Sequence, residues 1–113
     1  MPADLKDELT GEAHSILGLI YLREKKLSPS QQEFLITIKL KPKDPLPYYR
    51  LGMAYREDKK NDLAMEALGE SVCLKGASET EARDMLKQLY LSENRSETGL
   101  EDYIKVCGAR IGQ

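Results

Sequence analysis

The sequence predicts an all-α fold of tandem antiparallel helical hairpins, and three observations lead to this prediction. Two stretches of the chain match at a spacing of 34 residues, apolar residues in each recur three and four places apart, and helix start signals separate them. A spacing of this length is typical of stacked helical hairpins, so we expect about six helices and no strand. The identical pairs are Leu17/Leu51, Gly18/Gly52, Tyr21/Tyr55, Lys25/Lys59, Lys26/Lys60, Leu40/Leu74 and Lys41/Lys75.

Helix start and stop signals divide the chain into four parts. We expect a tail or short lead-in helix over residues 1–10, one hairpin over 11–44, a second over 45–78, and a degenerate capping pair of helices over 79–113. Pro42 and Gly76 are expected to end the second and fourth helices. The expected N-caps of the six helices are Thr10, Ser28, Asp44, Asn61, Ser78 and Thr98.

Each hairpin carries a glycine in the interior of its first helix, Gly18 and Gly52. Glycine costs about 1 kcal/mol against alanine at such a position. A missing Cβ lets a neighbouring helix approach closely, and this is the compensating advantage that we expect here. Ser30 and Ala64, the small residues of the second helices, are the predicted contacts of these glycines.

The second hairpin resembles a tetratricopeptide repeat through Tyr48, Leu51, Gly52, Tyr55, Ala64 and Leu68. The first resembles it through His14, Leu17, Gly18, Tyr21, Phe34 and Pro42, so the resemblance covers Gly11 to Ser78. It implies a right-handed solenoid whose concave side is lined by the first helix of each hairpin. Ala82, Met85, Leu86 and Leu89 depart from the pattern, which is why residues 79–113 are expected to cap the stack.

Composition excludes several classes of function. The chain has 113 residues and a formal net charge of −2, which gives no electrostatic footprint for nucleic acid. No apolar run approaches the ~20 residues that span a membrane. Cys73 and Cys107 lack metal-ligand spacing and are expected to be buried or half-buried thiols in a reducing compartment. We therefore expect a cytoplasmic protein, although an exported protein whose signal had been removed would look the same.

The residues favour neither catalysis nor a cofactor or metal. His14 is the single histidine, and it stands where the tetratricopeptide pattern has a packing aromatic residue. Gly18 and Gly52 lie inside helices rather than in a phosphate-binding loop. We expect no enzyme, no cofactor and no metal site.

A strip of apolar residues with a basic border lies next to the packing face of the first helix of each hairpin. Hairpin packing does not require these apolar residues, and such a strip is typical of a peptide-binding surface. We predict a protein–protein interaction scaffold that holds a peptide or helix of a partner protein in its concave groove. The predicted groove residues are Leu19, Leu22, Arg23, Leu46, Tyr49, Met53, Arg56, Arg83 and Lys87.

Three alternatives stay open. The strip is covered within the chain, by residues 1–9 or by the last helix. The chain is a self-assembly module, for example a homodimer packed end to end through Leu5, Leu9 and the last helix, since two regular repeats are fewer than the ~3 that a stable stack needs. Finally, the chain is a fragment of a larger multidomain protein whose other domains hold the activity.

Overall fold

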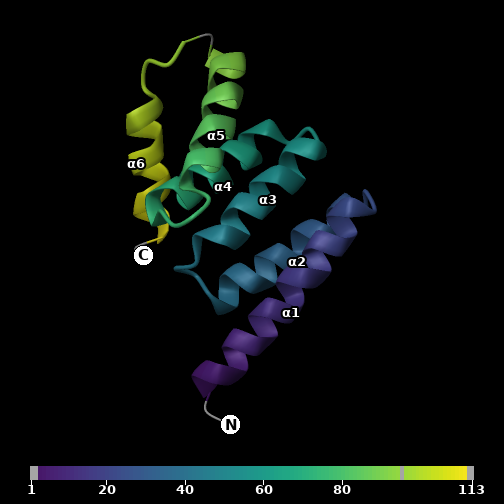
Figure 1. Ribbon diagram of the computed structural model, residues 1–113. Coiled ribbons are helices and arrows are strands. Elements are labelled where there is room, and N and C mark those ends of the chain that lie inside the picture. The colour runs from purple at the N-terminus through teal and green to yellow at the C-terminus, as the bar shows by residue number, and fades with distance from the viewer. Residues whose placement is uncertain (1–2, 95, 112–113) are drawn as a thin grey trace.

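Six α-helices make up the fold (Figure 1). The computed structural model describes residues 3–94 and 96–111, and their side chains from Leu9 onward. Within these residues there are six helices and no strand, which confirms the predicted all-α class. The helices are α1 (Ala3–Arg23), α2 (Leu27–Leu40), α3 (Pro45–Glu57), α4 (Asn61–Leu74), α5 (Glu79–Asn94) and α6 (Leu100–Ile111).

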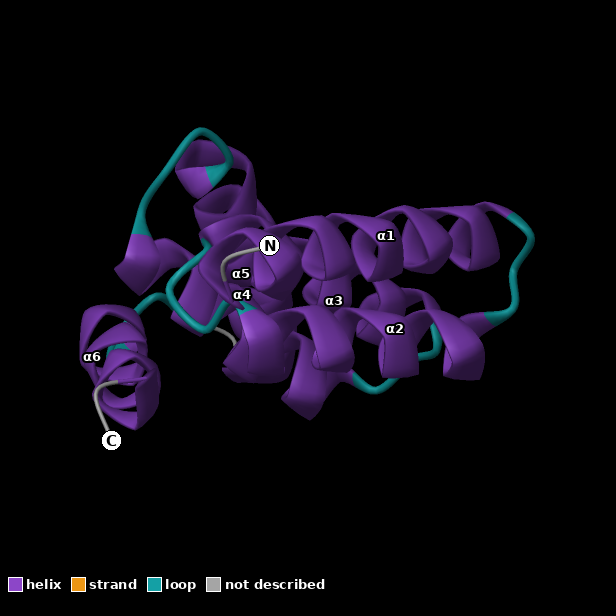
Figure 2. Ribbon diagram, turned by 90° about the horizontal axis from the view of Figure 1, so that it is seen from below, coloured by secondary structure: helices purple, strands orange, loops and turns teal. Residues whose placement is uncertain are grey.

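The helices pack mainly on their neighbours in the sequence. From α1 to α5 each helix packs against the next, and α4 also packs against α6. The α1–α2 pair and α6 lie on opposite sides of the molecule in both views (Figures 1 and 2). The molecule measures 49 × 31 × 22 Å along its principal axes, so it is elongated.

The two hairpin turns are built alike, 34 residues apart. Lys25 and Lys59 adopt left-handed conformations with φ of 62° and 59°. The next residue in each turn, Lys26 or Lys60, donates its N–H to the carbonyl of Tyr21 or Tyr55, both at 2.9 Å. These hydrogen bonds satisfy carbonyls at the end of one helix. The carbonyls of Lys26 and Lys60 accept the N–H groups of Ser30 and Ala64, at 3.1 and 2.9 Å, and these bonds start the next helix without a side-chain cap.

Four of the six predicted N-caps are wrong, and this turn explains two of them, Ser28 and Asn61. Lys26 and Lys60 occupy the N-cap positions of α2 and α4, without a side-chain cap bond, so Ser28 and Asn61 are not caps. The first helix runs from Ala3 through Thr10 without interruption. The start of α6 at Leu100 places Thr98 one residue too early.

Two other start signals agree with the structure. The Asp44 carboxylate accepts the Leu46 N–H at 3.1 Å and caps α3, with Pro45 at the first helical position. Helix α5 begins directly after Ser78. It continues to Asn94, so the polar residues Ser92, Glu93 and Asn94 are helical.

Both interior glycines mark close contacts between the helices of a hairpin. A Cβ at Gly18 would lie 2.6 Å from the Phe34 ring, and one at Gly52 would lie 2.7 Å from Leu68 Cγ. The predicted close approach is therefore present. The predicted small residues also contact the glycines: Ser30 donates its hydroxyl to the Gly18 carbonyl at 2.8 Å, and the Ala64 carbonyl oxygen would lie 3.4 Å from a Cβ at Gly52. Phe34 and Leu68 lie closer still.

The buried apolar residues form two clusters. The first cluster joins α4, α5 and α6, and the second joins α2, α3 and α4. Helix α1 adds only half-buried leucines to the second cluster, so it is the helix least embedded in the core. The first cluster is Met65, Leu68, Val72, Ala82, Leu86, Leu100 and Ile104, and the second is Phe34, Leu51, Ala54 and Ala67.

Small residues let α4 and α6 approach each other. A Cβ at Gly69 would lie 2.7 Å from Cys107 Sγ, and one at Gly108 would lie 2.6 Å from Cys73 Sγ. The Cys73 thiol donates to the Ile104 carbonyl at 2.9 Å. Both cysteines are free, Cys73 half-buried and Cys107 buried, as predicted. Burial raises the pKa of Cys107 to about 11, which keeps this thiol protonated and unreactive at neutral pH.

Candidate functional site

Three of the predicted groove residues also pack into the protein itself. Leu19 and Leu22 of α1 are half-buried against the second core cluster. Tyr49 of α3 is half-buried against the first. Only part of each of these three side chains is therefore free on the predicted strip, since each is half-buried against core residues.

The start of α3 is where the predicted strip stays open. Leu46 is exposed and Met53, two turns further on, is half-buried. Beside Leu46 the surface is hollowed by about 490 Å³, between the first turn of α3 and the segment that joins α4 to α5. We call this the Leu46 hollow; it is lined by Asp44, Pro45, Leu46, Gly76, Ala77, Ser78 and Glu81.

The Leu46 hollow has apolar side chains with carboxylates beside them. Pro45, Leu46 and Ala77 supply the apolar atoms, and Asp44 and Glu81 supply the negative charge. Gly76 shapes this wall, because its φ of 92° is a left-handed conformation and a Cβ there would lie 2.6 Å from Pro45 Cγ. An apolar side chain next to a basic group fits such a surface.

The predicted basic border is only partly present. Arg83 contacts Glu101 at 2.6 Å and Lys87 contacts Glu97 at 3.0 Å, so both reach toward α6 and the loop before it. Arg23 and Arg56 lie at the C-terminal ends of α1 and α3. An ion pair of 3.3 Å between Lys25 and Glu57 joins these two helix ends.

Arg50 connects α3 to α1 through a polar contact. Its guanidinium donates to the Ser15 hydroxyl at 2.7 Å. Burial lowers the pKa of Arg50, and the charges of Glu12 and Asp44 partly oppose this shift. The side chain therefore links α3 to α1.

His14 also has a structural contact. Its Nδ1 lies 2.5 Å from a carboxylate oxygen of Glu33, a residue of α2 that the sequence does not mark as its partner. Among the side chains that the structure describes, no group of three or more His, Cys, Asp or Glu residues is placed to hold a metal ion. The His14–Glu33 pair links α1 to α2, the two helices of the first hairpin.

A second apolar hollow, between α2, α3 and α4, is absent from the sequence-based prediction. It encloses about 220 Å³ and includes the exposed Leu35 and Leu63. Burial raises the pKa values of Tyr55 and Glu70 in its wall. A spacing argument along one helix does not find such a hollow, because its residues come from three helices. Its lining is Leu35, Ile38, Tyr48, Leu51, Tyr55, Leu63, Glu66, Ala67 and Glu70.

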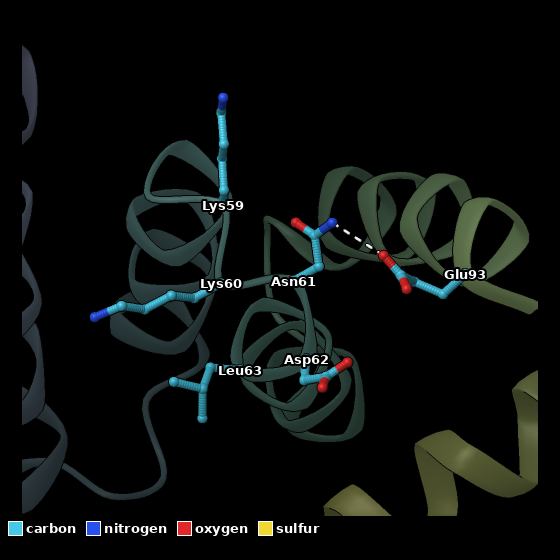
Figure 3. Close-up of a pocket in the computed structure, with 6 residues that line it drawn as sticks. All are labelled: Lys59, Lys60, Asn61, Asp62, Leu63 and Glu93. Carbon is cyan, nitrogen blue, oxygen red and sulfur yellow. Dashed lines mark hydrogen bonds between the residues drawn. The ribbon is translucent and has the colours of Figure 1, made fainter.

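A third hollow, of about 410 Å³, lies where the α3–α4 turn meets the end of α5 (Figure 3). The Asn61 amide donates to the Glu93 carboxylate there at 3.0 Å. Lys59 and Lys60 extend away from this pair in different directions (Figure 3). Separated charges of both signs and a single apolar residue, Leu63, do not define a ligand class.

Helix α1 carries an exposed apolar face that the sequence reasoning only partly anticipates. Leu17, which belongs to the tetratricopeptide-like pattern of the first hairpin, is 40% exposed. Leu9, Ile16 and Ile20 are exposed on the same helix. Their spacing of three, four and seven residues puts them together on one side of α1. We call Leu9, Ile16, Leu17 and Ile20 the outer face of α1.

The chain was compared with family models, curated proteins and solved structures, and none of them matches it. The resemblance to tetratricopeptide repeats therefore stays a prediction that rests on the residue pattern. None of the described helices combines the length and the apolar character needed to cross a membrane.

Proposed function

We propose that this chain is a protein–protein interaction module, and that a segment of the partner binds along α3, from the Leu46 hollow over Tyr49 to Met53. The observation that carries the proposal is the Leu46 hollow, an indented surface beside an exposed leucine of the predicted strip. The resemblance to tetratricopeptide repeats supports the same surface. A non-catalytic role is part of the proposal.

The spacing along α3 sets the size of the bound segment. Leu46, Tyr49, Met53 and Arg56 are three or four residues apart and follow one side of the helix. From Leu46 to Arg56 the helix rises about 15 Å. A partner segment of about five extended residues or about ten helical residues covers that length.

The charges at the two ends of this strip favour a partner segment that carries opposite charges at its own two ends. Asp44 and Glu81 lie at the Leu46 end, and Arg56 lies at the other. We expect a segment with a basic residue near Leu46, apolar residues in the middle and an acidic residue near Arg56. Exposed ion pairs contribute about 0–1 kcal/mol each, so these charges set orientation, while apolar burial supplies most of the affinity.

A selection from a phage-displayed library of random peptides tests the proposal. We expect enriched peptides to follow this charge pattern and to shift the backbone amide NMR signals of α3 and the start of α5. Leu46→Glu should weaken their binding about tenfold or more, because burial of a leucine side chain is worth about 1.5–3 kcal/mol. Glutamate is well tolerated in the first turn of a helix, so the variant should fold.

The matched control is Val106→Glu, which makes the same kind of change at an exposed apolar residue of α6. This variant should bind the selected peptides as the wild type does. Peptides that shift signals elsewhere, or that bind the Leu46→Glu variant unchanged, would contradict the proposed surface.

A further inference from the structure

We propose that the outer face of α1 is a self-association surface, on which α1 of a second copy of this chain packs antiparallel about a two-fold axis. This surface is separate from the strip on α3, so the inference does not depend on the function proposed above. Matching the apolar residues of two antiparallel α1 helices sets Leu9 opposite Ile20 of the other copy, and Ala13 opposite Ile16.

The corresponding face of α3 shows what kind of partner fits. Residues 34 places after Ile16, Leu17 and Ile20 are Arg50, Leu51 and Ala54, and the last two are buried. Helix α2 covers this face of α3, and Phe34 of α2 belongs to the same core cluster as Leu51 and Ala54. The outer face of α1 is thus built as a face that receives a helix, and no described helix of the chain lies on it.

The length of α1 points to a partner beyond its own hairpin. The last turn of α2 lies beside Gly11, since the Thr37 hydroxyl is 3.4 Å from the Gly11 carbonyl and a Cβ at Gly11 would meet the Lys41 side chain at 2.8 Å. Residues 3–10 of α1 therefore extend past the end of α2 (Figure 1). Two helical turns receive little stability from backbone hydrogen bonds alone, and a second helix alongside would supply the missing packing.

The charges along α1 select a second copy in the antiparallel direction. The first half of the helix carries Asp4, Asp7, Glu8 and Glu12 against a single lysine, Lys6. The end of the helix and the turn after it carry Arg23, Lys25 and Lys26 against Glu24. Antiparallel packing brings opposite charges together, whereas parallel packing would bring like charges together.

The last helix is a poorer match for the outer face of α1. Exposed residues of α6 include Asp102, Lys105 and Arg110, with Val106 as its exposed large apolar residue. An end-to-end assembly of α1 on α6 would bury these charged side chains against apolar ones. Packing of α1 on α1 in this register pairs Leu9 with Ile20 and Ala13 with Ile16, with Leu17 next to Glu12 at the border. This arrangement closes as a symmetric dimer.

Sedimentation equilibrium of the 113-residue chain over a range of concentrations tests the association. We expect a reversible dimer, with twice the mass of the 12.8 kDa chain. Ile16→Glu should raise the dissociation constant about 100-fold or more, because the two-fold axis introduces two buried carboxylates at once. Ile16 is 54% exposed in the single chain, so helicity measured by circular dichroism should not change.

Val106→Glu is the matched control, since its residue is 58% exposed on α6, and this variant should dimerise as the wild type does. A wild type that stays monomeric at every concentration would overturn the proposal. Equal dimerisation of wild type and Ile16→Glu would overturn it as well, since another surface would then be responsible.

Disulfide trapping tests the direction of packing. On mild oxidation of a mixture, Leu9→Cys and Ile20→Cys should form a disulfide with each other and not with themselves. Wild type is the control for the native thiols, which are half-buried or buried. Homodimers of Leu9→Cys would show parallel packing, and a mixture without any cross-link would show that the helices do not meet; either result overturns the antiparallel arrangement.

Discussion

The first helices of the two hairpins have corresponding residues in opposite environments. On α3, Leu51 is 4% exposed and Ala54 is fully buried. On α1, the residues 34 places earlier, Leu17 and Ile20, are 40% and 46% exposed. The turns and the glycine contacts of the two hairpins are nevertheless alike. Burial on this face is therefore decided by whether a helix precedes it in the stack, as α2 precedes α3.

The second helices of the two hairpins, α2 and α4, also differ in whether another helix covers them, and here the cause is the residue at one position. On α4, Gly69 lets Cys107 of α6 approach closely. On α2, the residue 34 places earlier is Leu35, which is exposed. A leucine side chain would hold a helix away from the distance at which α6 packs on α4. Two hairpins of similar geometry can therefore pack against different numbers of helices, because a few side chains allow or prevent close approach.

The largest expected effect comes from truncating the corresponding leucines. Leu51→Ala should lower the free energy of unfolding by about 2–5 kcal/mol, because it leaves a cavity in the second core cluster. Leu17→Ala should cost less than about 1 kcal/mol when measured on the monomer, since surface substitutions have small effects. Urea denaturation of both variants at low protein concentration is the measurement.

Equal losses of unfolding free energy in the two variants would contradict the difference between α1 and α3, because Leu17 would then be buried in the single chain. A loss for Leu17→Ala that grows with protein concentration would instead locate the cause of the difference. It would show that the outer face of α1 is covered only in the dimer.

The next largest effect is expected from exchanging Gly69 of α4 and Leu35 of α2, which stand 34 residues apart. Gly69→Leu should lower the free energy of unfolding by about 1–3 kcal/mol, because its side chain would overlap Cys107 and push α6 from α4. Reaction of Cys107 with a thiol reagent should become faster, since displacement of α6 removes the burial that raises its pKa.

The reciprocal change, Leu35→Gly, is the control for helix propensity. It should cost about 1 kcal/mol, the usual penalty of glycine in an exposed helix interior. Unchanged labelling of Cys107 in Gly69→Leu would contradict the contact between α4 and α6.

The smallest expected effect concerns a carboxylate of the second hairpin. Glu70 is half-buried, while Ile36, 34 places earlier, is exposed. Burial raises the pKa of Glu70; Glu66 adds to the shift, and Arg110 opposes it. A carboxyl whose pKa is raised in the folded state favours folding below its ordinary pKa, and that contribution is lost as the pH rises through the folded-state pKa.

Glu70→Gln should therefore stabilise the protein slightly at neutral pH, and the advantage should vanish as the pH falls below the ordinary pKa of 4.5. The test is the difference in unfolding free energy between wild type and Glu70→Gln, measured from pH 3 to 8 in steps of about one pH unit. A variant that is less stable than wild type at neutral pH would mean that attraction to Arg110 outweighs burial.

Local patterns predicted the helices well and their caps poorly. Apolar spacing and the 34-residue shift predicted six helices, and Asp44 was identified correctly as a cap because its carboxylate bonds a backbone N–H two residues away. Ser28 and Asn61 have the same chemistry as Asp44, but backbone hydrogen bonds within the turns had already fixed the helix starts.

The candidate site was harder to predict because it depends on several helices. Leu46 was placed on an open surface by its position on one helix, and the structure agrees. Leu19 and Tyr49 satisfy the same spacing, yet they contact core residues supplied by other helices. Arg83 was predicted to border the groove, and the sequence did not indicate its ion pair with Glu101 of α6.

Residue spacing and composition were enough to predict where the chain is helical and where glycines bring helices together. These properties depend on residues within a few turns of one another. Only the tertiary structure decided which apolar faces are covered, because an apolar side chain is buried only if another helix arrives to exclude water from it. Leu17 and Leu51 are the same residue in the same local pattern, but a helix precedes α3 in the chain and packs on it, whereas no described helix precedes α1.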